Sequence, residues 1–172
     1  SRLAAALDRP TVLLGHSASC QVVAHTAALA PEHVRAVVLV GPTTDPRAAT
    51  WPRLAGRWLR TATHERPTQV PLLARSYART GPVWMRRAMD AARREDIRRD
   101  LCRLTAPVLV VRGRNDLICP SGWAAQLASL APAGSVAVDL PAGAHMVPLT
   151  HPDLLARASV RWLDGTVLDD GR

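Results

Sequence analysis

Apolar residues along the chain follow two different spacings. Short runs rich in valine and leucine are typical of strands. These runs are residues 11–14, 34–40, 107–112 and 135–140. Segments in which apolar residues recur every three or four positions are typical of helices. These segments are residues 2–8, 18–30, 122–130 and 152–163. The chain is therefore predicted to alternate between strands and helices.

Such alternation is typical of an α/β fold. Parallel strands must be joined by crossovers, which are right-handed and usually contain a helix. VRAVVLV (34–40) and PVLVVR (107–112) are almost continuously apolar, the pattern of strands covered on both faces. We expect a parallel sheet of about four strands with flanking helices.

Residues 43–106 are too long to be a single crossover. Apolar side chains at helical spacing form one face in residues 51–62, and a second such face occurs in residues 82–97. We therefore expect a helical insertion over the carboxyl edge of the sheet, where open α/β folds bind ligands. The core is then built from residues 1–42 and 107–172 of a single domain.

The stretch Gly15-His16-Ser17-Ala18-Ser19 joins the first strand to the helix after it. A serine on such a tight turn projects its hydroxyl above the sheet edge, if its neighbours are small enough for strand and helix to approach. The N–H groups at the helix start can then stabilise negative charge. The same serine could also be an ordinary N-cap, so a catalytic role requires partners.

An acid and a base follow two of the later strands. Asp116 comes after the third strand and His145 after the fourth. Parallel strands end at one edge of the sheet, so Ser17, Asp116 and His145 are expected there in the chain order serine, acid, histidine. Asp116 could also be a turn residue. Asp45 is a weaker rival for the acid and His151 for the base.

Four pieces of the chain, in this order and context, resemble the α/β-hydrolase family: LLGHSAS, VVLVGP, PVLVVRGRNDLICP and PAGAHMVPLTHPDLL. The resemblance covers nearly all of the chain outside residues 43–106. It implies Ser17 as nucleophile, His145 as general base and then acid, and Asp116 as the carboxylate that orients the imidazole. It also implies an oxyanion donor at Ala18, a helical cap at 43–106, and no need for a metal or organic cofactor.

The expected reaction is hydrolysis of an ester or a related acyl bond. Its substrate would be a small molecule with an apolar portion. Candidate pocket residues are three tryptophans of the insertion, Trp51, Trp58 and Trp84, and His16 beside the nucleophile. Hydrolysis of a carbon–carbon bond in a diketone-like substrate would use the same triad. A further alternative is a non-catalytic fragment that binds a partner.

Two features depart from the family's pattern. Ser19 stands where the family usually has glycine, which makes the approach of helix and strand less easy. Family members also have further strands before the nucleophile strand, and a loop there supplies a second oxyanion donor. The sequence thus resembles the C-terminal half of the fold. We expect an impaired hydrolase, or an open edge at residues 11–14 that pairs with a second copy or an upstream half.

The composition of the chain limits the classes of partner that we expect. All 22 basic residues are arginine, against 14 acidic residues, for a net charge of +8. Neither a nucleic-acid-binding motif nor an apolar run of about 20 residues is present, so we expect neither nucleic acid nor a membrane as partner. Cys20, Cys102 and Cys119 fit no metal or disulfide spacing. Reduced thiols are typical of a cytoplasmic protein, which we therefore expect.

Overall fold

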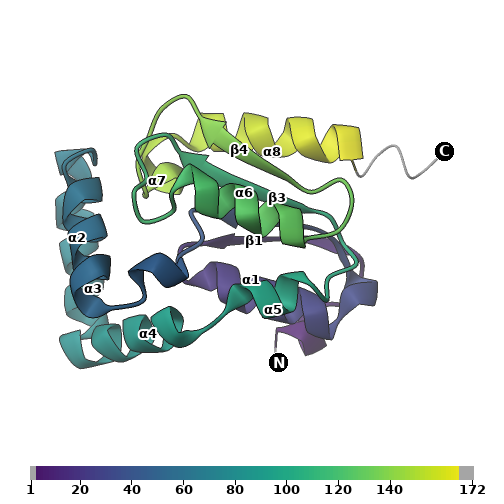
Figure 1. Cartoon of the computed structure of the whole chain (residues 1–172), viewed down its shortest axis with the longest axis horizontal. Coiled ribbons are helices and arrows are strands. Elements are labelled where there is room, and N and C mark those ends of the chain that lie inside the picture. Colours follow the sequence, from purple (N-terminus) through teal and green to yellow (C-terminus); the bar gives the residue numbers. More distant parts are fainter. Residues whose placement is uncertain (1–2, 167–172) are drawn as a thin grey trace.

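The structure is a computed structural model that describes residues 3–166. Within them, four parallel strands form one sheet in the order β1-β2-β3-β4. The strands are β1 (Thr11–His16), β2 (Val34–Val40), β3 (Val108–Gly113) and β4 (Val136–Leu140). The sheet runs through the centre of the molecule between its helices (Figure 1). The prediction of an α/β fold with four parallel strands and flanking helices is confirmed.

Helices cover both faces of the sheet. The helices on one face are α1 (Ser19–Leu29), α5 (Ile97–Leu101) and α6 (Ser121–Leu130). The other face is covered by α8 (Pro152–Thr166), which the short α7 (Val147–Thr150) precedes. Figure 1 shows α8 and the pair α1 and α5 on opposite sides of the strands. The helices expected at 18–30, 122–130 and 152–163 are present, with ends shifted by a few residues.

The strand register sorts alternate side chains into two apolar cores. Leu13 lies beside Val37 on the neighbouring strand, and both belong to the core under α1, α5 and α6. Val38 lies beside Leu109, and both belong to the core under α8. Because side chains of a strand alternate between its two faces, the continuous apolar runs of β2 and β3 fill both cores.

A group of helices lies at the carboxyl edge of the sheet, on the left in Figure 1. Its helices are α2 (Trp51–Ala62), α3 (Val70–Thr80) and α4 (Pro82–Arg94), with 3₁₀ turns at Pro46–Ala48 and Pro67–Gln69. The helices expected at 51–62 and 82–97 are present, the second ending at Arg94. The additional helix α3 contains Pro71 in its first turn, where the missing N–H of proline is not needed.

The last part of the expected insertion packs with the core. Ile97 and Leu101 of α5 are 1% and 0% exposed and belong to the core under α1. By contrast, α3 and α4 contain no buried residue. Residues 43–96 thus form a helical segment outside the sheet core, whereas the expected insertion extends to residue 106.

The first strand lies at one edge of the sheet. Its side chains Val12 and Leu14 are 39% and 52% exposed, on the face that α8 covers farther along the sheet. Before this strand, Ala4–Ala6 form only a 3₁₀ turn with no buried residue, instead of the expected helix end. No helix within residues 3–166 is long and apolar enough to cross a membrane.

Candidate active site

Ser17 occupies a strained turn between β1 and α1. Its φ is +57°, in the left-handed region that residues other than glycine seldom adopt. Its N–H donates to the carbonyl oxygen of Val40 at 2.9 Å, which ties the turn to the end of β2. A Cβ added at Gly15 would lie 2.9 Å from Cys20 Cα, so only glycine fits where strand and helix pass closest. The turn has the geometry of a nucleophile elbow.

Ser19, rather than Ser17, closes the turn with its side chain. The Ser19 hydroxyl donates to the carbonyl oxygen of His16 at 2.7 Å and accepts the N–H of His16 at 2.8 Å. These bonds show how a serine is accommodated at the position where glycine is usual. The Ser17 hydroxyl caps no helix N–H among the described residues, and its Oγ lies 2.9 Å from Nε2 of His145 instead.

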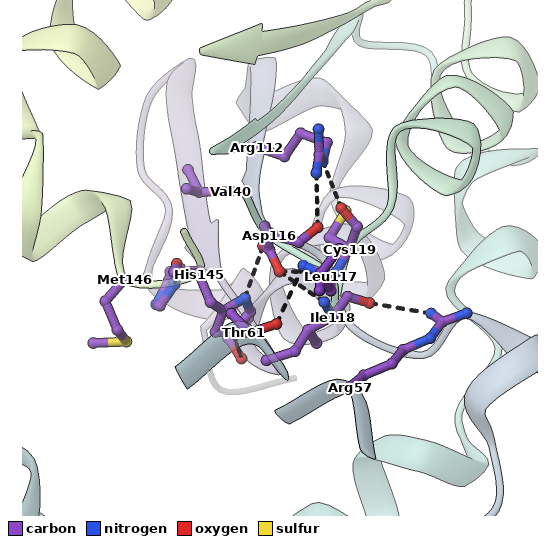
Figure 2. A network of polar contacts seen from close by, with 12 residues as sticks. Val40, Arg57, Thr61, Arg112, Asp116, Leu117, Ile118, Cys119, His145 and Met146 are labelled. Carbon is purple, nitrogen blue, oxygen red and sulfur yellow. Dashed lines mark hydrogen bonds and ion pairs between the residues drawn. The ribbon is translucent and has the colours of Figure 1, made fainter. Parts of the chain in front are cut away.

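The three residues expected to form a triad lie in one hydrogen-bonded chain. His145 contacts Ser17 Oγ through Nε2 and Asp116 Oδ2 through Nδ1, both at 2.9 Å. The contact between His145 and Asp116 is visible in Figure 2. Asp116 and His145 are 0% and 3% exposed. If Nδ1–H donates to the carboxylate, Nε2 is free to accept the serine O–H, which is the arrangement that a general base needs.

The loop after β3 holds Asp116 in place. Its other carboxylate oxygen, Oδ1, accepts the N–H groups of Ile118 and Cys119 at 2.9 and 3.0 Å. Buried Arg112 donates to the carbonyl oxygens of Asp116 and Cys119 at 2.7 and 2.6 Å (Figure 2), and to Asp139 Oδ2 at 2.8 Å. These bonds fix the loop so that Oδ2 faces His145.

Two glycines leave room for the acid and the base. Gly41, after β2, has a φ of +54°. A Cβ added there would lie 3.0 Å from Asp116 Oδ2 and 3.2 Å from His145 Nδ1. A Cβ added at Gly113 would overlap the carbonyl oxygen of Ala144. A side chain at either position would therefore push apart the loops that carry the acid and the base.

His16 contacts the histidine loop and does not line the cavity next to Ser17. Its Nε2 lies 2.9 Å from the carbonyl oxygen of His145, and the two ring centroids are 5.0 Å apart. Burial, and then the neighbouring His145, lower the pKa of His16. His16 is thus neutral at pH 7, and its Nε2–H donates to that carbonyl. His16 thus contacts the loop of His145, and its expected role in binding substrate stays a prediction.

A cavity of about 360 Å³ opens beside Ser17 and Ala18. Most of its wall is apolar and comes from the helical segment. The larger apolar wall residues are Leu54, Trp58, Tyr77, Met85, Met89 and Ile118. The ring of Trp58 meets the ring of His145 edge-on, with centroids 5.8 Å apart. The hydroxyl of Ser17 therefore faces an apolar chamber.

The two charged side chains in the cavity wall, Asp45 and Arg93, are each paired with oppositely charged residues outside the wall. Asp45, which is 2% exposed, accepts hydrogen bonds from Arg47 and Arg57 at 2.8 and 2.7 Å. Burial raises the pKa of Asp45, but the bonds from both arginines outweigh it and hold the pKa below its ordinary value. Arg93 is likewise paired with Asp90. Asp45, the rival acid, thus binds arginines and not His145.

Two of the three expected pocket tryptophans lie outside this cavity. Trp84 is 66% exposed and stacks with Arg87. Trp51 lines a neighbouring hollow that shares Tyr77, Met85 and Met89 with the cavity. Arg93 stacks on the ring of Trp51. The helix period explains the position of Trp84: its neighbour Met85 faces the cavity, and successive residues of a helix point about 100° apart.

Other reactive side chains near the site have different partners. His151, the rival base, lies directly before α8, with Nδ1 2.9 Å from Thr150 Oγ1 and Nε2 3.4 Å from Arg66. Cys20 is fully buried, and burial raises the pKa of its thiol, which therefore stays protonated. Residues 3–166 contain no cluster of three side chains that could hold a metal ion.

Some residues at the site were not identified from the sequence. Thr43 lines the cavity, and its buried hydroxyl has no hydrogen-bond partner within residues 3–166. Thr61 and Glu65 contact the loops of Asp116 and His145. Thr61 lies near the end of α2 and Glu65 in the bend just after it, and no local pattern indicates which loops they meet.

Comparison with known proteins identifies the fold. The model of the Alpha/beta hydrolase family matches residues 1–158, whereas no curated protein matches the chain. A hydrolase from Oleispira antarctica is similar with a TM-score of 0.75 and 16% identity, over 93% of this chain and 67% of that one. A bromoperoxidase from Bacillus anthracis has a TM-score of 0.71 and 20% identity, over 95% of this chain and 71% of that one. A thermophilic esterase from Thermogutta terrifontis has a TM-score of 0.62 and 21% identity, over 94% of this chain and 67% of that one.

These solved structures are too distant in sequence to show more than a common fold. This chain also spans only 67% to 71% of their length. The family match is more informative, because it covers most of the chain, including the turn with Ser17 and the loops with Asp116 and His145. The chain therefore belongs to the alpha/beta hydrolase family.

Proposed function

We propose that the protein is a serine hydrolase that cleaves an ester or a related acyl bond. The observation that carries the proposal is the continuous hydrogen-bonded chain Ser17–His145–Asp116 beside an apolar cavity. A serine hydroxyl is a weak nucleophile until a base takes its proton, and a buried carboxylate keeps that base in the required tautomer. All three groups are within hydrogen-bond distance of their neighbours.

The proposed reaction has two halves. Ser17 Oγ attacks the substrate carbonyl carbon while His145 Nε2 takes the serine proton, and Asp116 stabilises the resulting imidazolium. His145 then gives the proton to the leaving alcohol, and an acyl-enzyme remains. In the second half, His145 takes a proton from water, which attacks the acyl group, and the acid is released as Ser17 regains its proton.

The negative oxygen formed in each half needs hydrogen-bond donors. We assign one to the N–H of Ala18, which follows the nucleophile, lines the cavity, and has no hydrogen-bond partner among the described residues. The family takes a second donor from a loop before the nucleophile strand, and we assign none within residues 3–166. Loss of one donor lowers kcat by roughly 10²- to 10³-fold in other serine hydrolases, so we expect slow turnover by this chain alone.

The cavity wall favours a neutral, largely apolar substrate. A smaller hollow of about 250 Å³ contacts His145 and shares Trp58 with the cavity beside Ser17. We infer that the two parts of the substrate lie on either side of Trp58. Arg93, the arginine in the wall of the cavity beside Ser17, is already paired with Asp90, and the Thr43 hydroxyl is available for one polar atom of the substrate.

A fluorophosphonate probe tests the proposal. Ser17 Oγ would attack phosphorus and displace fluoride, leaving a phosphonylated protein that mass spectrometry detects. We expect labelling of the wild-type chain and of the control Ser129→Ala, whose serine is exposed on α6, but none of Ser17→Ala. Equal labelling of Ser17→Ala, or a folded wild-type chain that takes up no probe, contradicts the proposal.

The Thr43 hydroxyl also favours an alternative substrate, a diketone-like molecule whose carbon–carbon bond is hydrolysed by the same triad. A second carbonyl would provide the partner that this hydroxyl lacks within residues 3–166. Assays of a p-nitrophenyl ester and a matched 1,3-diketone separate the two. We expect faster ester hydrolysis, and a preference for the diketone that Thr43→Val removes would favour the alternative.

The edge strand supports a different function, binding of another polypeptide. Val12 and Leu14 are exposed, and the outer edge of β1 pairs with no strand among residues 3–166. An added strand would cover such an edge, and we propose a second copy or an upstream half as its source. Light scattering would show a dimer that Leu14→Glu dissociates. A stable monomer with esterase activity would contradict self-association.

A further inference from the structure

Helix α2 contacts the loop that carries the proposed acid. Near the end of this helix, Thr61 is 2% exposed, and its hydroxyl oxygen accepts the N–H of Leu117 at 3.2 Å. Leu117 directly follows Asp116, and Figure 2 shows Thr61 facing this loop. The bond thus links the helical segment to the backbone that positions Asp116.

Glu65, four residues after Thr61, makes the corresponding contact with the histidine loop. Its Oε1 accepts the N–H of Met146, the residue after His145, at 2.8 Å. Its Oε2 accepts a hydrogen bond from Gln69 Nε2 at 2.7 Å, and Gln69 is 5% exposed. Both carboxylate oxygens of Glu65 therefore accept hydrogen bonds, and the bond from Gln69 to Oε2 restrains Oε1 in its position against the loop.

The burial of Thr61 distinguishes this contact from ordinary helix packing. Of the residues of α2, Thr61 alone is buried. A helix is normally held on a protein by the burial of an apolar face. Here the buried position carries a hydroxyl, and burying a polar group is costly unless it has a partner. The N–H of Leu117 is that partner.

We propose that Thr61 and Glu65 are positioning residues of the triad. Each accepts the backbone N–H that follows a triad member, and together they hold Asp116 and His145 at hydrogen-bond distance from one another. The proposal rests on the proposed hydrolase function. Because Trp58 lies on the same helix and lines the cavity, a substrate that seats against Trp58 would also stabilise the alignment of His145.

Thr61→Val tests the first contact, because valine has the shape of threonine but accepts no hydrogen bond. A misplacement of about 1 Å at a catalytic group can cost on the order of 10²-fold in rate. We expect kcat for a p-nitrophenyl ester to fall roughly 10- to 100-fold with little change in KM, and Thr61→Ser to restore it. Thr63→Val is the matched control on the exposed side of the same helix end and should keep the wild-type kcat.

Glu65→Met and Glu65→Gln test the second contact. Methionine removes the acceptor, and we expect kcat to fall roughly tenfold. Glutamine keeps an oxygen for the N–H of Met146. Its new NH₂ group can donate to Gln69 Oε1, which has no partner within residues 3–166, so Glu65→Gln should retain most of the activity. Glu95→Met, at an exposed glutamate, is the matched control.

An NMR measurement gives an outcome that does not depend on turnover. The proton between His145 Nδ1 and Asp116 should give a strongly downfield resonance, which Thr61→Val and Glu65→Met should broaden or shift and both controls should leave unchanged. If the wild type gives this resonance and both variants broaden or shift it, but the wild type takes up no fluorophosphonate, the hydrolase function fails and the positioning role stands. If the wild type is labelled and both variants keep the wild-type kcat and resonance, the positioning role is overturned. Circular dichroism shows whether each variant is folded. If Thr61→Val does not fold, the Glu65 variants test the positioning role in its place.

Discussion

The sheet core and the helical segment differ in how firmly their residues are held. Every residue of β3 is buried, and so are all but one in β2. In the helical segment, α3 and α4 contain no buried residue. Three apolar side chains of the helical segment, Leu59, Val83 and Trp84, are 61% to 71% exposed. The proposed triad lies on loops of the core, whereas most of the cavity wall comes from the helical segment.

This difference separates the chemistry of the site from its shape. A close-packed core restrains the groups attached to it, and proton transfer requires such precise placement. A segment that buries little apolar surface opens at lower free energy, and a wall needs only to fit the substrate. Changes in the core should therefore affect rate or stability. Changes in the segment should affect substrate choice, except at the side chains that bind loops of the core, which are Thr61, Glu65 and Arg57. Four experiments test this, from the largest expected effect to the smallest.

Replacement of the base should have the largest effect. His145→Gln removes the group proposed to take the Ser17 proton, and we expect kcat to fall by roughly 10⁴-fold or more, as it does when serine hydrolases lose their histidine. His151→Gln, the matched control at the rival histidine, should stay within about tenfold of the wild type. Steady-state kinetics on an activated ester measures both. A larger loss in His151→Gln than in His145→Gln would refute the assignment of the base.

A pair of leucine truncations compares the stability of the two regions. Leu39 in β2 is 0% exposed and Leu59 in α2 is 71% exposed. We expect Leu39→Ala to lower the free energy of unfolding by about 3 kcal/mol, because it leaves a cavity in a packed core. Leu59→Ala should change it by no more than about 0.5 kcal/mol. Urea unfolding measures both values, and equal losses would show that the helical segment is packed as firmly as the sheet.

Arg57 of α2 links the two regions, because it donates both to Asp45 and to the carbonyl oxygen of Ile118 in the loop after β3. The pKa of Asp45 is held below its ordinary value of 3.8, so its ionised form favours the folded state, and that contribution is lost as the pH falls below about 4. Asp45→Asn should lower the free energy of unfolding at pH 7 by about 2 kcal/mol. The difference from the wild type should shrink below pH 4. Urea unfolding at several pH values measures this difference, and Asp8→Asn, at an exposed aspartate, is the control. A difference in stability that grows as the pH falls would contradict the prediction.

A change in the cavity wall should have the smallest effect and alter specificity. Met89 lines the cavity, and Val83 on the same helix is 61% exposed. We expect Met89→Ala to shift the ratio of kcat/KM between long and short acyl esters by about tenfold toward the long ones, since it enlarges the chamber. Val83→Ala should leave the ratio unchanged. A loss of activity toward both esters without a change in their ratio would mean that Met89 does not contact the acyl group.

Much of the fold could be predicted because its signals are local. The strand expected at residues 34–40 has those bounds in the structure, since a continuous apolar run is typical of a strand covered on both faces. The helix at 51–62 also has its expected bounds, from apolar side chains at helical spacing. The 3₁₀ turn at Ala4–Ala6 replaces an expected helix end, because an apolar composition over so few residues does not establish a helix.

The candidate site was predictable only in part. Ser17, Asp116 and His145 each follow a strand, and parallel strands end at one edge of the sheet, so their proximity could be expected. The cavity could not be predicted residue by residue. Trp58 lines it, whereas Trp51 and Trp84 do not, because the rotation of each helix about its own axis decides which side chains face inward.

The sequence by itself determined the alternation of strands and helices, the parallel sheet, and the edge at which the serine, acid and histidine lie. These follow from spacing along the chain and from the handedness of crossovers. Only the tertiary structure decided that Asp116 pairs with His145 while Asp45 pairs with Arg57, and that Thr61 and Glu65 meet the two triad loops. A hydrogen bond requires its two atoms to approach within about 3 Å. For residues far apart in the chain, that distance is set by packing and not by the local sequence.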